Sequence, residues 1–230
     1  MSRTKRETKS PKHREIIVLL GKPGSGKGTQ AEPLGRALGL PVIPVGKLLR
    51  AEIAKKSPLG KRAARDVAAG RLVPNDVTAA ILRKRLSRSD AKLGVIIDGC
   101  PRDLLQAGLL EEIAHVTHAF LISVTDREVM RRLSGRRVCT GCGKNYHMVA
   151  LRPRVAGICD ACGGKLARRP DDSIAVIRER LRSYERDTIP VLQFYRAHKV
   201  LRRVDGVGGI PEVQRRMRAM IRRDDRKGRI

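Results

Sequence analysis

The sequence predicts an α/β fold in which a parallel sheet lies between layers of helices. Short apolar segments such as Glu15–Leu20 and Val95–Asp98 have the length and the β-branched composition of buried strands. Longer segments with helical patterns separate them, and this alternation is typical of parallel sheets. Hydrophobic residues make up 41% of the chain, and Trp is absent. We therefore expect a core of Leu, Ile, Val and Ala.

The elements follow one another in a regular order. The first strand leads into a helix over Lys27–Leu38, which Gly39 ends and which contains Pro33. Further strands are expected at Val42–Val45, Val95–Asp98, Ala119–Ser123 and Val200–Val204. Further helices are expected at Leu48–Lys56, Lys61–Ala69, Leu104–Ile113, Ser173–Arg186, Pro190–His198 and Pro211–Arg223. Two more helices have expected caps: one is capped by Asn75 or Asp76 and runs to Leu86, and the other starts at a capping box of Thr125 and Glu128 and runs to Leu133.

The chain is strongly basic, with 50 Lys and Arg against 23 Asp and Glu and a net charge of +27. Such an excess indicates anionic partners, namely nucleotides, nucleic acid or an acidic surface, unless the sequence simply favours Arg. We expect a disordered basic arm over residues 1–14 and a basic tail over 224–230, either of which could bind nucleic acid non-specifically. No apolar run has the length of a membrane span or signal peptide, which predicts a cytoplasmic protein without membrane contact.

A glycine-rich segment, G-K-P-G-S-G-K-G-T, joins the first strand to the first helix. Its glycines let backbone N–H groups turn towards phosphate oxygens, and the N-terminus of the helix points at the same oxygens. Gly28 stands where the usual pattern has Ser or Thr for magnesium, and Thr29 follows. The segment predicts a P-loop NTPase-like core that binds ATP through Gly24, Ser25, Gly26, Lys27, Gly28 and Thr29.

Four of the five cysteines form two C-x-x-C pairs, Cys139 with Cys142 and Cys159 with Cys162. Their spacing fits a structural zinc site, and the absence of a secretory segment argues against disulfides. Four thiolates close the coordination sphere, so we predict structural Zn²⁺ and expect Cys100 to be a free thiol. Such a site can also bind nucleic acid, although the scarcity of aromatic residues counts against that alternative.

The glycine-rich segment resembles that of the nucleoside monophosphate kinases, in particular the adenylate kinases. Other motifs of that family follow in order: Pro58-Leu59-Gly60, Leu72-Val73-Pro74, Asp98-Gly99-Cys100-Pro101-Arg102, Gln106, Gly135-Arg136-Arg137, Arg169-Pro170-Asp171-Asp172 and Arg180. The resemblance implies a core of residues 15–44, 74–135 and 173–223, a monophosphate-binding subdomain over 45–73 and a zinc-binding lid over 136–172. It also implies reversible transfer of the γ-phosphate of ATP to AMP, with Mg²⁺ bound to ATP, by a monomer.

Phosphoryl transfer requires two anions held in line with their charge neutralised, and the guanidinium of Arg suits this task. By resemblance, the catalytic residues would be Lys27, Asp98, Arg102, Arg132, Arg136, Arg169 and Arg180. ATP would contact Arg132, Arg136, Asn145 and Tyr146 in addition to the glycine-rich segment. AMP would contact Val45, Arg50, Arg71, Leu72, Val73, Gly99, Cys100, Pro101, Arg102, Gln106, Arg169 and Arg180. Asp98 would orient Mg²⁺ through water, and Gln106 would touch the acceptor base.

Three residues around the implied acceptor site depart from the family pattern. Val45 lacks the hydroxyl that normally meets the base, and Cys100 replaces a phenylalanine of the pocket wall. Lys47 places a cation where the family usually has a carboxylate near the magnesium shell. A kinase for UMP, CMP or GMP, or a basic zinc-containing nucleic-acid-binding protein with weak kinase activity, therefore remains an alternative. Gln106 and the general layout favour AMP.

Overall fold

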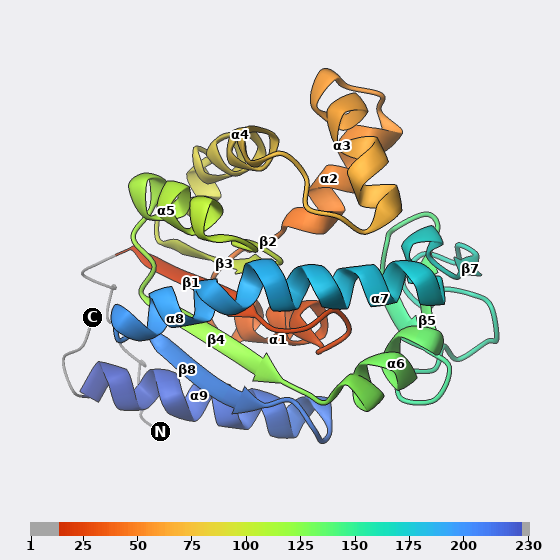
Figure 1. The fold of residues 1–230 in the computed structure, drawn as a ribbon. Helices are drawn as coiled ribbons and strands as arrows, with labels where there is room; N and C mark the ends of the chain where they lie inside the picture. Colours follow the sequence, from red (N-terminus) through yellow and green to blue (C-terminus); the bar gives the residue numbers. More distant parts are fainter. Residues whose placement is uncertain (1–13, 227–230) are drawn as a thin grey trace, which may run out of the picture.

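The computed structural model describes residues 14–226. Its centre is a five-stranded parallel sheet in the order β2-β3-β1-β4-β8, which confirms the predicted fold class (Figure 1). The strands are β1 (Glu15–Leu20), β2 (Val42–Pro44), β3 (Gly94–Asp98), β4 (His118–Ser123) and β8 (Leu201–Asp205). The basic arm, except for Arg14, and the last residues of the basic tail lie outside the described residues.

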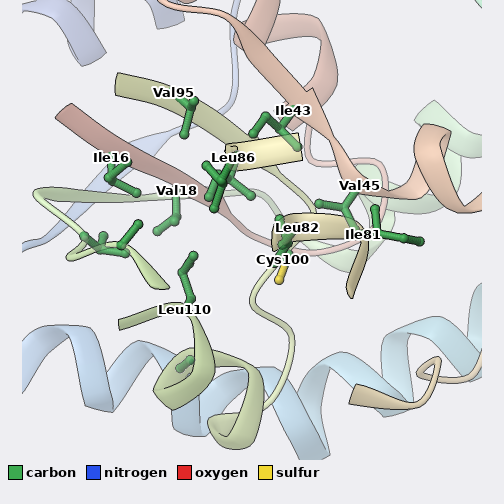
Figure 2. Packing of buried hydrophobic residues seen from close by; sticks show 14 of the residues in the cluster. Ile16, Val18, Ile43, Val45, Ile81, Leu82, Leu86, Val95, Cys100 and Leu110 are labelled. Atoms are coloured by element: carbon green, nitrogen blue, oxygen red, sulfur yellow. The ribbon is translucent and has the colours of Figure 1, made fainter. Parts of the chain in front are cut away.

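The central strand β1 is buried on both faces, as its continuous apolar run predicts. Ile16 and Val18 point into one hydrophobic cluster, whereas Ile17 and Leu19 point into another. Figure 2 shows Ile16 and Val18 among residues of neighbouring elements, with Cys100 close to Leu82. The sheet is thus the middle layer of the core, and its strand ends form a fixed platform for the site.

Helices cover both faces of the sheet (Figure 1). They are α1 (Lys27–Leu38), α2 (Val45–Ala54), α3 (Pro58–Ala69), α4 (Asn75–Leu86), α5 (Leu104–Ile113), α6 (Asp126–Ser134), α7 (Ile174–Ser183), α8 (Ile189–Ala197) and α9 (Ile210–Arg226). One face is packed by α4, α5 and α8, and the other by α1 and α9. Within this second layer, the Gln214 amide donates to the backbone and side-chain oxygens of Gln30, both at 2.7 Å.

Helices α2 and α3 form a hairpin that projects from the core (Figure 1). The first of them begins at Val45, which the sequence analysis placed at the end of a strand. Ser57 caps α3 by accepting from the N–H of Gly60 at 3.0 Å. A Cβ atom on Gly60 would lie only 2.1 Å from the carbonyl oxygen of Glu52, so glycine permits the close packing of the two helices. For α4 the predicted cap is wrong: Pro74 occupies that position and no side chain caps the helix.

Residues 136–172, predicted to be loop-like, contain a small antiparallel sheet. Its order is β6 (Asn145–His147), β5 (Arg136–Cys139) and β7 (Leu166–Ala167). The buried hydrophobic residues of this unit are Cys139, Tyr146 and Cys159. Strands this short have no apolar alternation to reveal them, and the cysteine cluster takes the place of a hydrophobic core. The short helix η2 (Pro170–Asp172) ends this segment.

The helix predicted over Ser173–Arg186 is interrupted. Helix α7 is capped by Ser173 and passes into a π-helical turn, η3 (Tyr184–Thr188), before α8 begins. At the end of this turn, the Thr188 hydroxyl donates to the carbonyl of Arg102 at 2.7 Å. The remaining 3₁₀ turn is η1 (Ser89–Ala91). Among the described residues, no helix combines the length and apolar character that a membrane crossing requires.

Candidate functional site

The glycine-rich segment wraps around the ammonium group of Lys27. Lys27 Nζ donates to the carbonyl oxygens of Gly21 at 2.7 Å and Lys22 at 2.9 Å. Gly24 and Gly26 have φ angles of +74° and +101°, a region that glycine adopts without strain. Burial lowers the pKa of Lys27 to about 7, although the negative charge of Asp98 acts in the opposite direction. A bound polyphosphate would restore the charge of this ammonium.

The carboxylate of Asp98 lies beside the start of α1. Asp98 ends β3 and pairs in register with Leu19 of β1, two residues before the glycine-rich segment begins at Gly21. A Cβ atom on Gly28 would lie 3.0 Å from Asp98 Oδ2, which explains glycine at this position. Burial raises the pKa of Asp98, while Lys27 and Arg102 act in the opposite direction. An acidic group is therefore held next to the place where phosphates would bind.

Arg132 braces the glycine-rich segment from helix α6. Its guanidinium donates to the carbonyls of Ser25 and Gly206, both at 2.9 Å, and to the Glu128 carboxylate at 2.6 Å. Thr125 caps this helix as predicted, but the Glu128 side chain pairs with arginines instead of completing the capping box. The hydrogen bonds that Glu128 accepts lower its pKa to about 2, and the bond from Arg131 has the largest effect.

Three arginines predicted from separate motifs meet at two adjacent aspartates. Arg136 donates to Asp172 on both carboxylate oxygens, and Arg169 does the same to Asp171. Arg180 reaches both aspartates, with Nη1 3.3 Å from Asp172 Oδ1. Burial raises the pKa of Asp171, but the charge and hydrogen bonds of Arg169 together with the charges of Arg180 and Arg50 outweigh it, so the pKa is lowered overall. Both aspartates belong to the motif Arg169-Pro170-Asp171-Asp172, but no role for them could be predicted from the sequence.

The same arginines are partly withdrawn from water. Arg180 has 14% of its side chain exposed, and burial lowers its pKa to about 9, which keeps it charged at neutral pH. Arg50 of α2 responds in the same way, and burial together with Arg169 lowers its pKa to about 10. Arg102, Arg136 and Arg180 each affect the pKa of Lys27 electrostatically. One strongly positive site thus joins the core, α2 and the start of the lid.

The turn after β3 shapes the neighbouring pocket. The peptide bond between Cys100 and Pro101 is cis, and Gly99 has a φ of +86°. Arg102 Nε donates to the carbonyl of Gly99 at 2.8 Å, which directs its guanidinium. Burial raises the pKa of the Cys100 thiol to about 12. This thiol lies 3.6 Å from Gln106 Oε1, so it is a packed part of the wall.

Gln106 is held by three neighbours. Its Oε1 accepts from the backbone N–H of Arg102 at 2.9 Å and from the Cys100 thiol, and its Nε2 donates to Asn75 Oδ1 at 2.8 Å. Asn75 was considered in the sequence only as a helix cap. The packing of α4 against α5 brings Asn75 to Gln106, and no local pattern in the sequence predicts this packing.

The remaining predicted acceptor residues differ in their surroundings. Val45 and Val73 are buried in the core cluster, and Leu72 is half-buried. Arg71 pairs with Asp66 at 2.8 Å and has 45% of its side chain exposed. Asp66 therefore neutralises Arg71 at the end of α3.

The four cysteines Cys139, Cys142, Cys159 and Cys162 come together as the two C-x-x-C pairs predict. Their sulfur atoms all lie within 4.8 Å of one another, a spacing that suits four thiolates around one Zn²⁺. The backbone N–H of Cys142 points at Cys139 Sγ at 3.5 Å, which favours a thiolate there. A closed set of sulfur ligands indicates a structural ion.

Tyr146, predicted to contact ATP, is buried next to these cysteines. Its hydroxyl lies 3.4 Å from Cys159 Sγ and accepts from the N–H of Asp160 at 2.8 Å. The ammonium of Lys144 lies over the Tyr146 ring, 5.5 Å from its centroid, in a cation–π contact. The neighbouring Asn145, also predicted at the ATP site, is exposed. Tyr146 thus orients one metal-site cysteine.

Comparisons with known proteins agree with this geometry. A family model described as "Adenylate kinase" matches residues 19–200. A protein named "Adenylate kinase" from Thermosipho melanesiensis is 42% identical over 212 residues, which cover 90% of this chain and 99% of that protein. Proteins of the same name from Trichlorobacter lovleyi and Geobacter sp. are 40% and 41% identical, covering 89% and 90% of this chain and 98% and 99% of their own. The similarity therefore extends over nearly their whole length.

Proposed function

Because this chain belongs to the adenylate kinase family, we propose that it moves the γ-phosphate of ATP to AMP with the side chains described above. It is an ATP:AMP phosphotransferase, and the reversible reaction yields two ADP. The observation that supports these roles best is the set of charges around Lys27, to which Asp98, Arg102, Arg136 and Arg180 contribute.

On the donor side, the proposal assigns the phosphates of ATP to Lys27 and to the backbone of Gly24, Ser25, Gly26, Gly28 and Thr29. Arg132 keeps this segment in place through its hydrogen bond to Ser25 and also approaches ATP, together with Arg136. The fixed N–H groups and the ammonium stabilise negative charge without reorganising during transfer. Asn145 and the backbone at Tyr146 would border the nucleotide from the lid.

On the acceptor side, Arg50 and Arg102 bind the phosphate of AMP, and Gln106 contacts its base. The hydrogen bonds to Gln106 support this role because they fix the direction of its amide. Arg169 and Arg180 close on the transferring group, held by the aspartates until the substrates compete for them. The wall of the base pocket would consist of Val45, Leu72, Val73, Gly99, Cys100 and Pro101, with Arg71 at its rim.

Two metal ions belong to the proposal. Asp98 fits a role in holding Mg²⁺ through water, since its carboxylate lies beside Gly28 at the phosphate-binding segment. When bound with ATP, Mg²⁺ neutralises charge on the phosphates. Zn²⁺ would be held by the four lid cysteines, where it stabilises residues 136–172. Closure of that segment and of residues 45–73 would exclude water from the transfer.

The proposal also places the protein in the cytoplasm, where reducing conditions keep the four thiols available to zinc, and treats it as a monomer. Non-specific binding of nucleic acid by the basic termini is a separate hypothesis supported by the net charge of +27. It predicts binding that weakens steeply with salt and that is lost when residues 1–14 are removed. Binding that survives this truncation would contradict it.

The test is diphosphate formation from MgATP with AMP, GMP, CMP and UMP supplied separately. We expect AMP to be the best acceptor and Lys27→Ala or Arg102→Ala to lower kcat/KM by about a hundredfold or more. Arg36→Ala, which removes an exposed charge at the end of α1, serves as the control and should retain activity. Full activity in either site variant, or a preference for another monophosphate, would refute the assigned roles.

A further inference from the structure

Lys47 joins the monophosphate-binding segment to the cysteine-rich lid. From the first turn of α2, its Nζ donates to the carbonyl oxygen of Cys142 at 3.0 Å. The next residue of the lid, Gly143, leaves room for this approach, since a Cβ atom added there would lie 3.2 Å from Lys47 Cε. Within residues 14–226, no other hydrogen bond from a side chain connects residues 45–73 with residues 136–172. The contact is thus the one side-chain hydrogen bond between these two segments in the described part of the chain, and the segments also meet where α3 packs against η2.

The turn that carries Cys139 and Cys142, here called the cysteine turn, favours a cation beside it. The carbonyl that Lys47 contacts belongs to one of the four metal-site cysteines. A Zn²⁺ ion held by four thiolates carries net negative charge, which adds an attraction for the ammonium to the hydrogen bond. The carboxylate that the family usually has at this position would be repelled from such a turn.

We propose that Lys47 is a positioning residue that holds α2 against the cysteine turn when the site closes. The inference rests on the proposed function and assigns Lys47 a place within it. Helix α2 also carries Arg50, so a bridge from this helix to the lid links closure over AMP with closure over ATP. Lys47 acts through the lid rather than through the magnesium shell, because its Nζ is directed to Cys142.

Kinetics of three variants test the bridge. Lys47→Met keeps the length of the side chain but removes the donor, and it should raise the KM for AMP about two- to fivefold, the range for an exposed charged contact. Its kcat should stay the same or rise, because reopening limits turnover in many enzymes with lids. Lys47→Arg should retain a KM close to that of the parent protein. Lys61→Met is the matched control, an exposed lysine of α3 in the same hairpin.

Two results would overturn the proposal. The first is an unchanged KM for AMP in Lys47→Met, or an equal rise in Lys61→Met. The second is a higher kcat in Lys47→Asp with the parent KM for AMP, since that result would assign the position to the magnesium shell. A rise in the KM for AMP in both Lys47→Met and Lys47→Asp supports the bridge.

Hydrogen exchange provides a readout that does not depend on turnover. With AMP and a non-hydrolysable ATP analogue bound, Lys47→Met should lose protection both in residues 45–54 and in residues 139–143. Protection equal to the parent in both segments would contradict the bridge. If no variant forms diphosphate, the proposed function fails, while the exchange difference still decides whether Lys47 couples the segments.

Discussion

The Nε2 atom of Gln106 donates a hydrogen bond to the Oδ1 atom of Asn75 at 2.8 Å. This bond links the first turn of α5 to the first residue of α4. Because Gln106 Oε1 already accepts from the backbone of Arg102, the amide of Gln106 has one orientation. Asn75 therefore determines how the proposed base contact presents its donor, although Asn75 itself belongs to another helix.

Replacing Asn75 by Ala should weaken AMP binding selectively. The loss of one neutral hydrogen bond corresponds to about 0.5–1.5 kcal/mol, so we expect the KM for AMP to rise about two- to twelvefold. The KM for ATP should not change, since Lys27 and its surroundings are untouched. Steady-state kinetics with each substrate varied in turn would measure both. An equal rise for ATP would mean that the variant disturbs the whole fold.

ATP binding should be accompanied by proton uptake at Lys27. Burial lowers the pKa of Lys27 to about 7, so above that pH the group is mostly neutral. The phosphates favour the ammonium form and raise this pKa, so binding at pH 8 takes up a proton, whereas at pH 6 the proton is already present. Calorimetric titration in buffers of different protonation enthalpy measures the uptake. The same uptake in Lys27→Met would contradict the assignment.

The cysteines should divide into four protected by metal and one protected by burial. We expect one zinc per chain and little thiol labelling in the native protein. A strong chelator should expose the lid cysteines Cys139, Cys142, Cys159 and Cys162 to labelling. Burial raises the pKa of Cys100 to about 12, so this thiol should react only after unfolding.

Mass spectrometry locates the labels. Cys100→Ser should keep its zinc and Cys139→Ser should lose it, and the opposite result would refute the site.

Packing of the hairpin α2–α3 can be tested with two glycines in helices. Gly60→Ala places a Cβ atom 2.1 Å from the Glu52 carbonyl oxygen, so it should lower the free energy of unfolding by about 1–3 kcal/mol. It should also raise the KM for AMP by displacing the helix that carries Arg50. Gly108→Ala on α5 meets no atom within 4 Å and should be neutral or stabilising by up to about 1 kcal/mol. Urea unfolding of both variants decides the comparison.

Much of the core could be predicted because local residues define its elements. Gly39 has a φ of +70° and ends α1 where the sequence analysis placed the end. Asp103 caps α5 by accepting from the N–H of Gln106 at 2.8 Å, and this helix has the predicted bounds. The strands of the lid are only two to four residues long, too short for an apolar alternation to reveal them in the sequence.

The site shows the same division. The glycine-rich segment identified Lys27, and the resemblance to the family pattern identified the arginines, several of which lie within helices. Glu128 lies four residues before Arg132 on the same helix, a local pair, whereas Asp172 lies 36 residues from Arg136 and is brought to it by the tertiary structure. The bridge from Lys47 to Cys142 spans 95 residues, and the sequence suggested only that the cation was unusual.

The hydrogen bonds from Gln214 to Gln30 have a consequence for synthesis on the ribosome. Gln30 lies in the helix that starts the phosphate site, but its partner is 184 residues further along the chain. Strand β8, at the edge of the sheet, is also synthesised after the other four strands of that sheet. A nascent chain therefore carries the glycine-rich segment long before the layer behind it is complete. ATP binding should consequently begin only after the segment that carries Gln214 has been synthesised.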